Sequence, residues 1–147
     1  MNIKSALLVS FVLFFYLFFN SNQYVSGAEQ KGSLKYKPTI AIDLDGVLNQ
    51  YEKGKFDENY IPPIKKGAKN FLYKLHKNGY NLVLFTNRKP LLASKWLIEN
   101  KIDMYFSDVT NVKPKAIIYL DDRSINFNGN YNEAFNNINN FKVYWKE

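Results

Sequence analysis

The sequence lacks cysteine altogether and contains a single histidine among its 147 residues. Without cysteine, thiol catalysis, disulfide bonds and thiolate zinc sites are excluded. The histidine, His76, lies in the middle of a predicted amphipathic helix and is more simply a surface residue than a metal ligand. No Asn-x-Ser/Thr acceptor for N-linked glycosylation occurs either, so glycosylation gives no independent mark of secretion.

Aromatic residues, in contrast, are abundant. Twelve Phe and eleven Tyr contribute most of the 17% aromatic content, and the hydrophobic content is 46%. This composition is sufficient for a packed core and argues against a disordered chain. The length suits a single domain. The net charge of +7 comes from lysines scattered among Asn and Tyr. Because the lysines are scattered and do not form a stripe, we interpret the positive charge as a contribution to general solubility. No clear nucleic-acid-binding motif is present.

The N-terminal part of the sequence is predicted to be a targeting segment. Lys4 precedes an uncharged apolar run over residues 6–19, which is short for a membrane span of about 20 residues but fits the core of a signal peptide. We therefore expect a signal peptide over 1–27, a linker over 28–38 and a folded domain over 39–147. This organisation predicts a secreted or extracytoplasmic protein. The alternative is an uncleaved anchor, with membrane association through the same segment.

Hydrophobic patterning predicts a parallel α/β domain. Short apolar runs predict strands, and apolar residues at i, i+3, i+4 and i+7 predict a helix. The expected strands cover 39–44, 81–86 and 116–120, and the expected helices cover 68–78 and 90–100. Strands that alternate with helices indicate a single Rossmann-like domain, a parallel sheet flanked by helices with right-handed crossovers.

Other segments give weaker signals. Residues 104–106 and 141–145 are candidate strands, and residues 49–60 suggest a loop or hairpin over the end of the first strand. The Asn-rich stretch over 126–140 is interleaved with apolar residues, so we expect it to be ordered.

Two aspartates, Asp43 and Asp45, follow the first predicted strand and precede Gly46. Residues two apart in a strand point to the same face, so both carboxylates can lean over one pocket, and Gly46 permits a sharp turn there. Because neighbouring carboxylates repel, the site needs a cation, a shared proton or a cationic side chain. A divalent metal satisfies this need, and oxygen ligands suit Mg²⁺. The alternative is that the pair merely caps a turn.

The other two predicted strands also end in polar residues. Ligands of open α/β sheets bind outside the carboxyl ends of the strands, so these residues are candidates for the same site. They are Thr86, Asn87 and Arg88 after one strand, and Asp121, Asp122 and Arg123 after the other. Two alternatives stay open: Thr86 and Asn87 as a helix N-cap pair, and Asp122 with Arg123 as a structural ion pair.

Together these segments resemble the four motifs of haloacid dehalogenase (HAD) superfamily phosphatases of the small capless type. The resemblance covers about residues 38–128, with motifs at 43–48, 84–88, 113–114 and 119–123. It implies a phosphomonoesterase in which Asp43 attacks phosphorus and forms a phosphoaspartyl intermediate. Asp45 would protonate the leaving oxygen and then activate water.

The same resemblance implies roles for the remaining residues. Mg²⁺ would be held by Asp43, the Asp45 backbone carbonyl and Asp121, with Asp122 as a further ligand. Lys113 would neutralise developing charge, with Lys115 as the neighbouring alternative. The substrate-binding residues would be Thr86, Asn87 and Arg88.

The spacing between these motifs leaves no room for a cap domain. An uncovered site cannot by itself enclose a small substrate and exclude water. Capless members of the superfamily act on bulky phosphorylated groups of macromolecules or gain closure by oligomerising. We therefore expect a phosphorylated substrate, macromolecular or presented to an oligomer. The competing hypotheses are a phosphate- or metal-binding module without turnover, and a nucleotide-sugar transferase that uses Asp-x-Asp for metal.

Overall fold

The computed structural model separates the chain into two parts, residues 1–35 and 36–147. The structure describes residues 37–51 and 56–145, all of which lie in the second part. The predicted signal peptide, the membrane anchor and most of the linker therefore lie outside the described residues. A helix both long and apolar enough to cross a membrane is not found within the described ranges.

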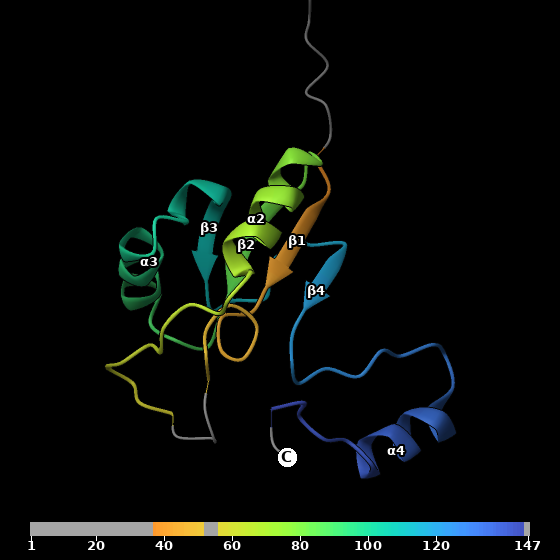
Figure 1. The fold of residues 1–147 in the computed structure, drawn as a ribbon. Coiled ribbons are helices and arrows are strands. Elements are labelled where there is room, and N and C mark those ends of the chain that lie inside the picture. Colours follow the sequence, from red (N-terminus) through yellow and green to blue (C-terminus); the bar gives the residue numbers. More distant parts are fainter. Residues whose placement is uncertain (1–36, 52–55, 146–147) are drawn as a thin grey trace, which may run out of the picture. The chain divides into compact units, whose positions relative to one another are not determined.

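The described residues form a parallel α/β domain with a Rossmann-like sheet (Figure 1). The four strands are β1 (Thr39–Ile42), β2 (Asn81–Phe85), β3 (Phe106–Thr110) and β4 (Ile118–Leu120), in the order β3-β2-β1-β4. Every pairing is parallel, and Ile42 is in register with Leu84 on one side and Leu120 on the other. The predicted fold class is confirmed.

The helical elements are α2 (Ala68–Lys77), α3 (Pro90–Glu99), a short 3₁₀ helix η1 (Asp103–Tyr105) and α4 (Tyr131–Asn139). Helix α2 connects β1 to β2, and α3 lies in the connection from β2 to β3. Successive strands β1, β2 and β3 lie side by side, so right-handed crossovers place α2 and α3 on the same face of the sheet.

That face carries the hydrophobic core. Alternate residues of β1 and β2 point to one side of the sheet. They contribute Ile40, Ile42, Leu82 and Leu84, which cluster with Leu72 of α2 and with Trp96 and Leu97 of α3. Residues of α2 and α3 bury their apolar stripe in this cluster, and the carboxyl ends of β2, β1 and β4 are thereby fixed beside one another.

Two predicted elements are corrected. Residues 141–145 do not form a strand; they are held instead by side-chain hydrogen bonds, from Tyr144 Oη to the Gly46 carbonyl and from Trp145 Nε1 to Asp122. The strand predicted at 104–106 begins only at Phe106 and runs to Thr110. The prediction placed this strand too early in the sequence because Ser107 and Asp108 are polar and gave no strand signal. Polar residues are tolerated there because β3 lies at the edge of the sheet.

The Asn-rich stretch is ordered, as expected, and contains α4. Asn130 is its N-cap, because the side-chain oxygen accepts hydrogen bonds from the backbone N–H groups of Asn132 at 3.0 Å and Glu133 at 3.2 Å. None of the side chains of α4 is buried, and Figure 1 shows this helix beyond the carboxyl end of β4.

Candidate active site

The turn after β1 places the two aspartates of the first motif. The Asp43 backbone N–H donates to the Leu120 carbonyl at 2.9 Å and so extends the sheet by one residue. The chain then turns, because the N–H groups of Leu48 and Asn49 both donate to the Leu44 carbonyl, at 3.0 and 3.1 Å. Gly46 adopts a φ of 81° within this turn, a conformation that glycine adopts at little cost.

A pocket of about 210 Å³ lies at the carboxyl ends of the strands. Its lining combines carboxylates, a hydroxyl, an amide, a guanidinium and aromatic rings: Asp43, Asp45, Tyr51, Phe56, Phe85, Thr86, Asn87, Asp121 and Arg123. The three strand ends singled out in the sequence therefore meet at one pocket. Five of the predicted site residues line it, namely Asp43, Asp45, Thr86, Asn87 and Asp121.

Asp43, Asp121 and Asp122 form an acidic cluster beside this pocket. One carboxylate oxygen from each lies within 4.8 Å of the others. The Asp122 side chain is only 1% exposed, and its Oδ2 accepts a hydrogen bond from Trp145 Nε1. Its Oδ1 is buried without a hydrogen-bond partner, although Arg123 Nε lies 3.9 Å from it, so the ion pair between Asp122 and Arg123 is present. Three converging carboxylates, one with a buried oxygen that accepts no hydrogen bond, fit a hard divalent cation such as Mg²⁺.

The electrostatics of Asp43 are consistent with such a cluster. Burial is the main cause that raises the pKa of Asp43 from 3.8 to about 7, although a hydrogen bond from the Leu44 backbone opposes it. The negative charges of Asp121, Asp45 and Asp122 raise this pKa further. Without a cation, the charged form of Asp43 is therefore disfavoured near neutral pH.

This raised pKa predicts how stability depends on pH in the absence of metal. Between 3.8 and about 7, Asp43 stays protonated in the folded state but ionises in the unfolded state, so the unfolding free energy falls as the pH rises. We expect wild type to lose on the order of a few kcal/mol relative to Asp43→Asn between about pH 4 and pH 8. Urea unfolding of both proteins in EDTA measures the difference. A constant difference across this range would contradict the prediction.

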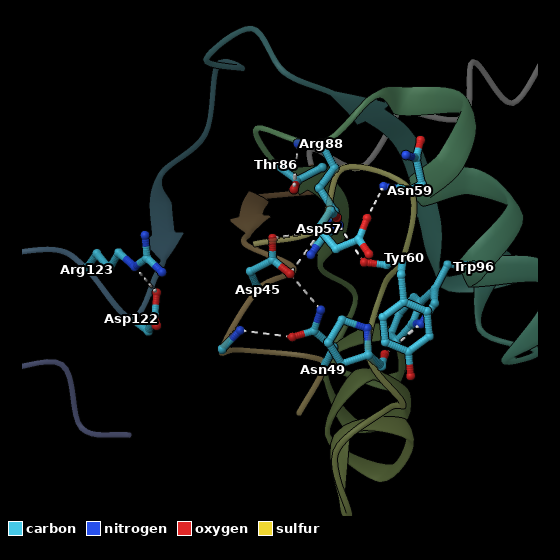
Figure 2. Close-up of polar contacts among 12 residues, drawn as sticks. Asp45, Asn49, Asp57, Asn59, Tyr60, Thr86, Arg88, Trp96, Asp122 and Arg123 are labelled. Atoms are coloured by element: carbon cyan, nitrogen blue, oxygen red, sulfur yellow. Dashed lines mark hydrogen bonds and ion pairs between the residues drawn. The ribbon is translucent and has the colours of Figure 1, made fainter. Parts of the chain in front are cut away.

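Asp45 is held by two buried side chains (Figure 2). Arg88 Nε donates to both carboxylate oxygens, at 3.0 and 2.8 Å, and Asn49 Nδ2 donates to Oδ1 at 2.7 Å. Asn49 also accepts a hydrogen bond from the Gly46 backbone N–H at 3.1 Å. Arg88 was predicted to bind substrate, but it is 2% exposed and does not line the pocket.

Arg123 is the cationic residue in the described pocket lining, and the predicted catalytic residue Lys113 is not part of that lining. Lys113 is exposed and its Nζ lies 4.8 Å from the centre of the Tyr119 ring, outside the pocket lining. Arg123 lines the pocket, with its guanidinium 5.4 Å from the ring centres of Tyr51 and Trp145.

The surroundings of Arg123 favour its charged form. Burial is the largest single cause and would lower the pKa of the guanidinium, but a hydrogen bond to Tyr51 and the nearby negative charges together outweigh it. The negative charges of Asp122 and Asp43 add to the net rise in pKa. The sequence placed Arg123 among the strand-end candidates and 49–60 in a loop over the first strand, but it did not single out Tyr51, Phe56 or Trp145 as residues of the site. The one available signal was that Arg123 directly follows two aspartates at a strand end.

The fold and the site together define a Rossmann-like α/β domain with an acidic pocket at the carboxyl ends of its strands. The chain matches no protein-family model, and no curated protein is significantly similar to it. Its structure is similar to that of a conserved protein from Bacteroides thetaiotaomicron, with 19% identity and a TM-score of 0.48 over 74% of this chain and 95% of that one.

A second solved structure is more distant. It is an uncharacterized protein from Listeria monocytogenes serotype 4b, with 18% identity and a TM-score of 0.44 over 54% of this chain and 52% of that one. Similarities at this level carry no argument about function, which rests on the residues of the pocket.

Proposed function

We propose that the protein is a magnesium-dependent phosphomonoester hydrolase with Asp43 as nucleophile, a capless member of the HAD superfamily. The observation that carries the proposal is the convergence of three strand ends on one pocket. Asp43 and Asp45 line this pocket together with Thr86, and the carboxylates of Asp43, Asp121 and Asp122 form a cluster suited to a divalent cation. The direct test is release of inorganic phosphate with magnesium, compared with release in EDTA.

The proposed reaction has two displacements at phosphorus. A carboxylate oxygen of Asp43 forms a bond to phosphorus while the ester P–O bond breaks, and Asp45 gives its proton to the leaving oxygen. Water then attacks the phosphoaspartate and gives a proton to Asp45, which frees phosphate and Asp43. Asp45 acts while its carboxylate is held by Arg88 and Asn49, so its orientation is fixed in both steps.

Other groups of the pocket stabilise the transferred phosphoryl group. Thr86 and Asn87, directly after β2, supply a hydroxyl and an amide as hydrogen-bond donors. Arg123 supplies the positive charge that was expected from Lys113. Mg²⁺ bound by Asp43, Asp121 and Asp122 would offset the charge of the three carboxylates and polarise the phosphoryl oxygens.

The alternative proposal, a phosphate- or metal-binding module without turnover, is favoured by one observation. The lysine that the motif resemblance assigns to catalysis lies outside the pocket lining. Arg123 weakens this alternative because it places a cation at the pocket in the absence of Lys113. The described residues add no further domain over the site, so the proposed substrate is a phosphorylated group on a macromolecule or a small ester enclosed by oligomerisation.

Trp145 is expected to tune magnesium affinity through Asp122. Its Nε1 donates to Asp122 Oδ2, while Oδ1 accepts no hydrogen bond and lies 3.9 Å from Arg123 Nε. Outer hydrogen bonds of this kind orient metal ligands, so Trp145→Phe should weaken magnesium binding about tenfold or more. Isothermal titration calorimetry measures the change.

Trp96→Phe is the matched control for this substitution. Trp96 also donates through Nε1, to the Pro62 carbonyl at 3.0 Å, but it belongs to α3 and to the core. Magnesium affinity should be unchanged in Trp96→Phe. Equal affinities in the two variants would show that Trp145 does not orient Asp122.

A further inference from the structure

The guanidinium of Arg88 joins two parts of the site that are distant in sequence. Besides the two bonds from Nε to Asp45, Nη1 donates to the backbone carbonyls of Asp57 at 2.7 Å and Tyr60 at 2.9 Å. These carbonyls belong to residues 56–60, here called the pocket-side segment, because its first residue, Phe56, lines the pocket. Figure 2 shows Arg88 between Asp45 and this segment.

The Phe56 ring is positioned by the same group. The guanidinium carbon of Arg88 lies 4.7 Å from the ring centre, within the range of a cation–π contact. Phe56 is nevertheless 49% exposed, so much of the ring is open to solvent beside the pocket. An exposed ring that is stacked on a buried cation is held in place without being covered.

Because Arg88 is buried, losing any of these contacts would cost much free energy. At 2% exposure its charge depends on Asp45, and Nη1 depends on the two carbonyls, because water is not available to replace them; Nη2 is buried without a hydrogen-bond partner. A guanidinium also offers its donors in a rigid plane, so a rotation that improves one set of bonds weakens the other. A change in the orientation of Asp45 would therefore alter the hydrogen bonds from Arg88 to the pocket-side segment, and a movement of that segment would alter those to Asp45.

We propose that Arg88 is a positioning residue that couples the orientation of Asp45 to the placement of the Phe56 wall of the pocket. Asp45 and the aromatic wall thereby take up one joint arrangement around a bound phosphomonoester. The proposal rests on the proposed function only for its kinetic consequences, since the coupling itself is a property of the folded chain.

Limited proteolysis of the folded full-length protein tests the coupling without any activity. Chymotrypsin cleaves after Phe56 and Tyr60 only when the pocket-side segment opens. Asp45→Asn removes the charge that faces Arg88, so cleavage at these two sites should accelerate about tenfold or more. Asp43→Asn is the matched control: it removes the same charge from the same turn, but Asp43 makes none of the Arg88 hydrogen bonds given above. Equal acceleration in both variants, or none in Asp45→Asn, would overturn the proposal.

The kinetic test compares Arg88→Lys with Asn49→Ala. Asn49 holds Asp45 but does not reach the pocket-side segment, so its loss should lower kcat with little change in KM. Arg88→Lys keeps the positive charge but loses the planar guanidinium that contacts Asp45 and the pocket-side segment at the same time. It should therefore lower kcat about 100-fold and also raise KM several-fold. A purely structural role predicts instead a smaller folded fraction with unchanged KM and unchanged kcat per folded molecule. If wild type releases no phosphate, the proposed function fails, while the proteolysis still decides the coupling.

Discussion

Asp43→Asn is expected to reduce phosphate release about 10³-fold or more, because an amide oxygen cannot serve as the nucleophile. The loss should appear in kcat, since Thr86, Asn87 and Arg123 stay in place to hold the phosphoryl group. The substitution also removes a charge from the acidic cluster, so the metal-free protein should be at least as stable as wild type near neutral pH. Initial rates of phosphate release and urea unfolding measure the two effects.

Asp103→Asn is a suitable control, because Asp103 is an exposed aspartate in η1 that does not line the pocket. It should retain the wild-type rate. If Asp43→Asn retained more than about a tenth of the activity, a water molecule rather than Asp43 would be the nucleophile.

Gly46→Ala is expected to cause the largest loss of stability among conservative substitutions at the site. An added Cβ would lie 2.8 Å from Asp122 Cγ and 2.9 Å from Trp145 Nε1, in addition to the strain of a φ of 81°. Strain and overpacking together predict a loss of about 2–4 kcal/mol in the unfolding free energy. Magnesium affinity should fall as well, because the displaced group is Asp122.

Gly79→Ala separates the two causes. Gly79 has a φ of 83°, but a Cβ there would meet nothing within 4 Å. Its loss should be limited to the strain of the backbone, about 1–2 kcal/mol, with magnesium affinity unchanged. Equal losses of stability in the two variants would mean that the chain end around Trp145 does not pack against Gly46.

The sheet and the acidic pocket could be predicted because both depend on short-range patterns. Apolar runs marked β1 and β2, and the polar residues directly after the strands marked the pocket, since parallel strands bring their carboxyl ends together. The edge strand β3 was misplaced because residues of an edge strand can be polar, so β3 lacks the apolar run that marks a buried strand. The helix α4 was not foreseen in a stretch dominated by Asn.

The supporting contacts of the site could not be predicted, because they join residues far apart in sequence. Arg88 and Asp45 are separated by 43 positions, and Tyr144 and Gly46 by 98. No periodicity links such residues, and a buried arginine has no sequence signature that distinguishes it from an exposed one. Lys113 was assigned from the motif resemblance, with Lys115 as the alternative, and no sequence pattern indicated that Arg123 would line the pocket instead.

The most direct test of the central claim is phosphate release by the purified full-length protein over a broad panel of phosphomonoesters. The panel includes sugar phosphates, nucleotides, nucleic-acid ends and phosphopeptides, each with magnesium or with EDTA. The proposed function predicts release that requires magnesium, and the ranking across the panel begins to define the substrate. A folded protein that binds magnesium but releases no phosphate from any member would contradict it and favour the binding module.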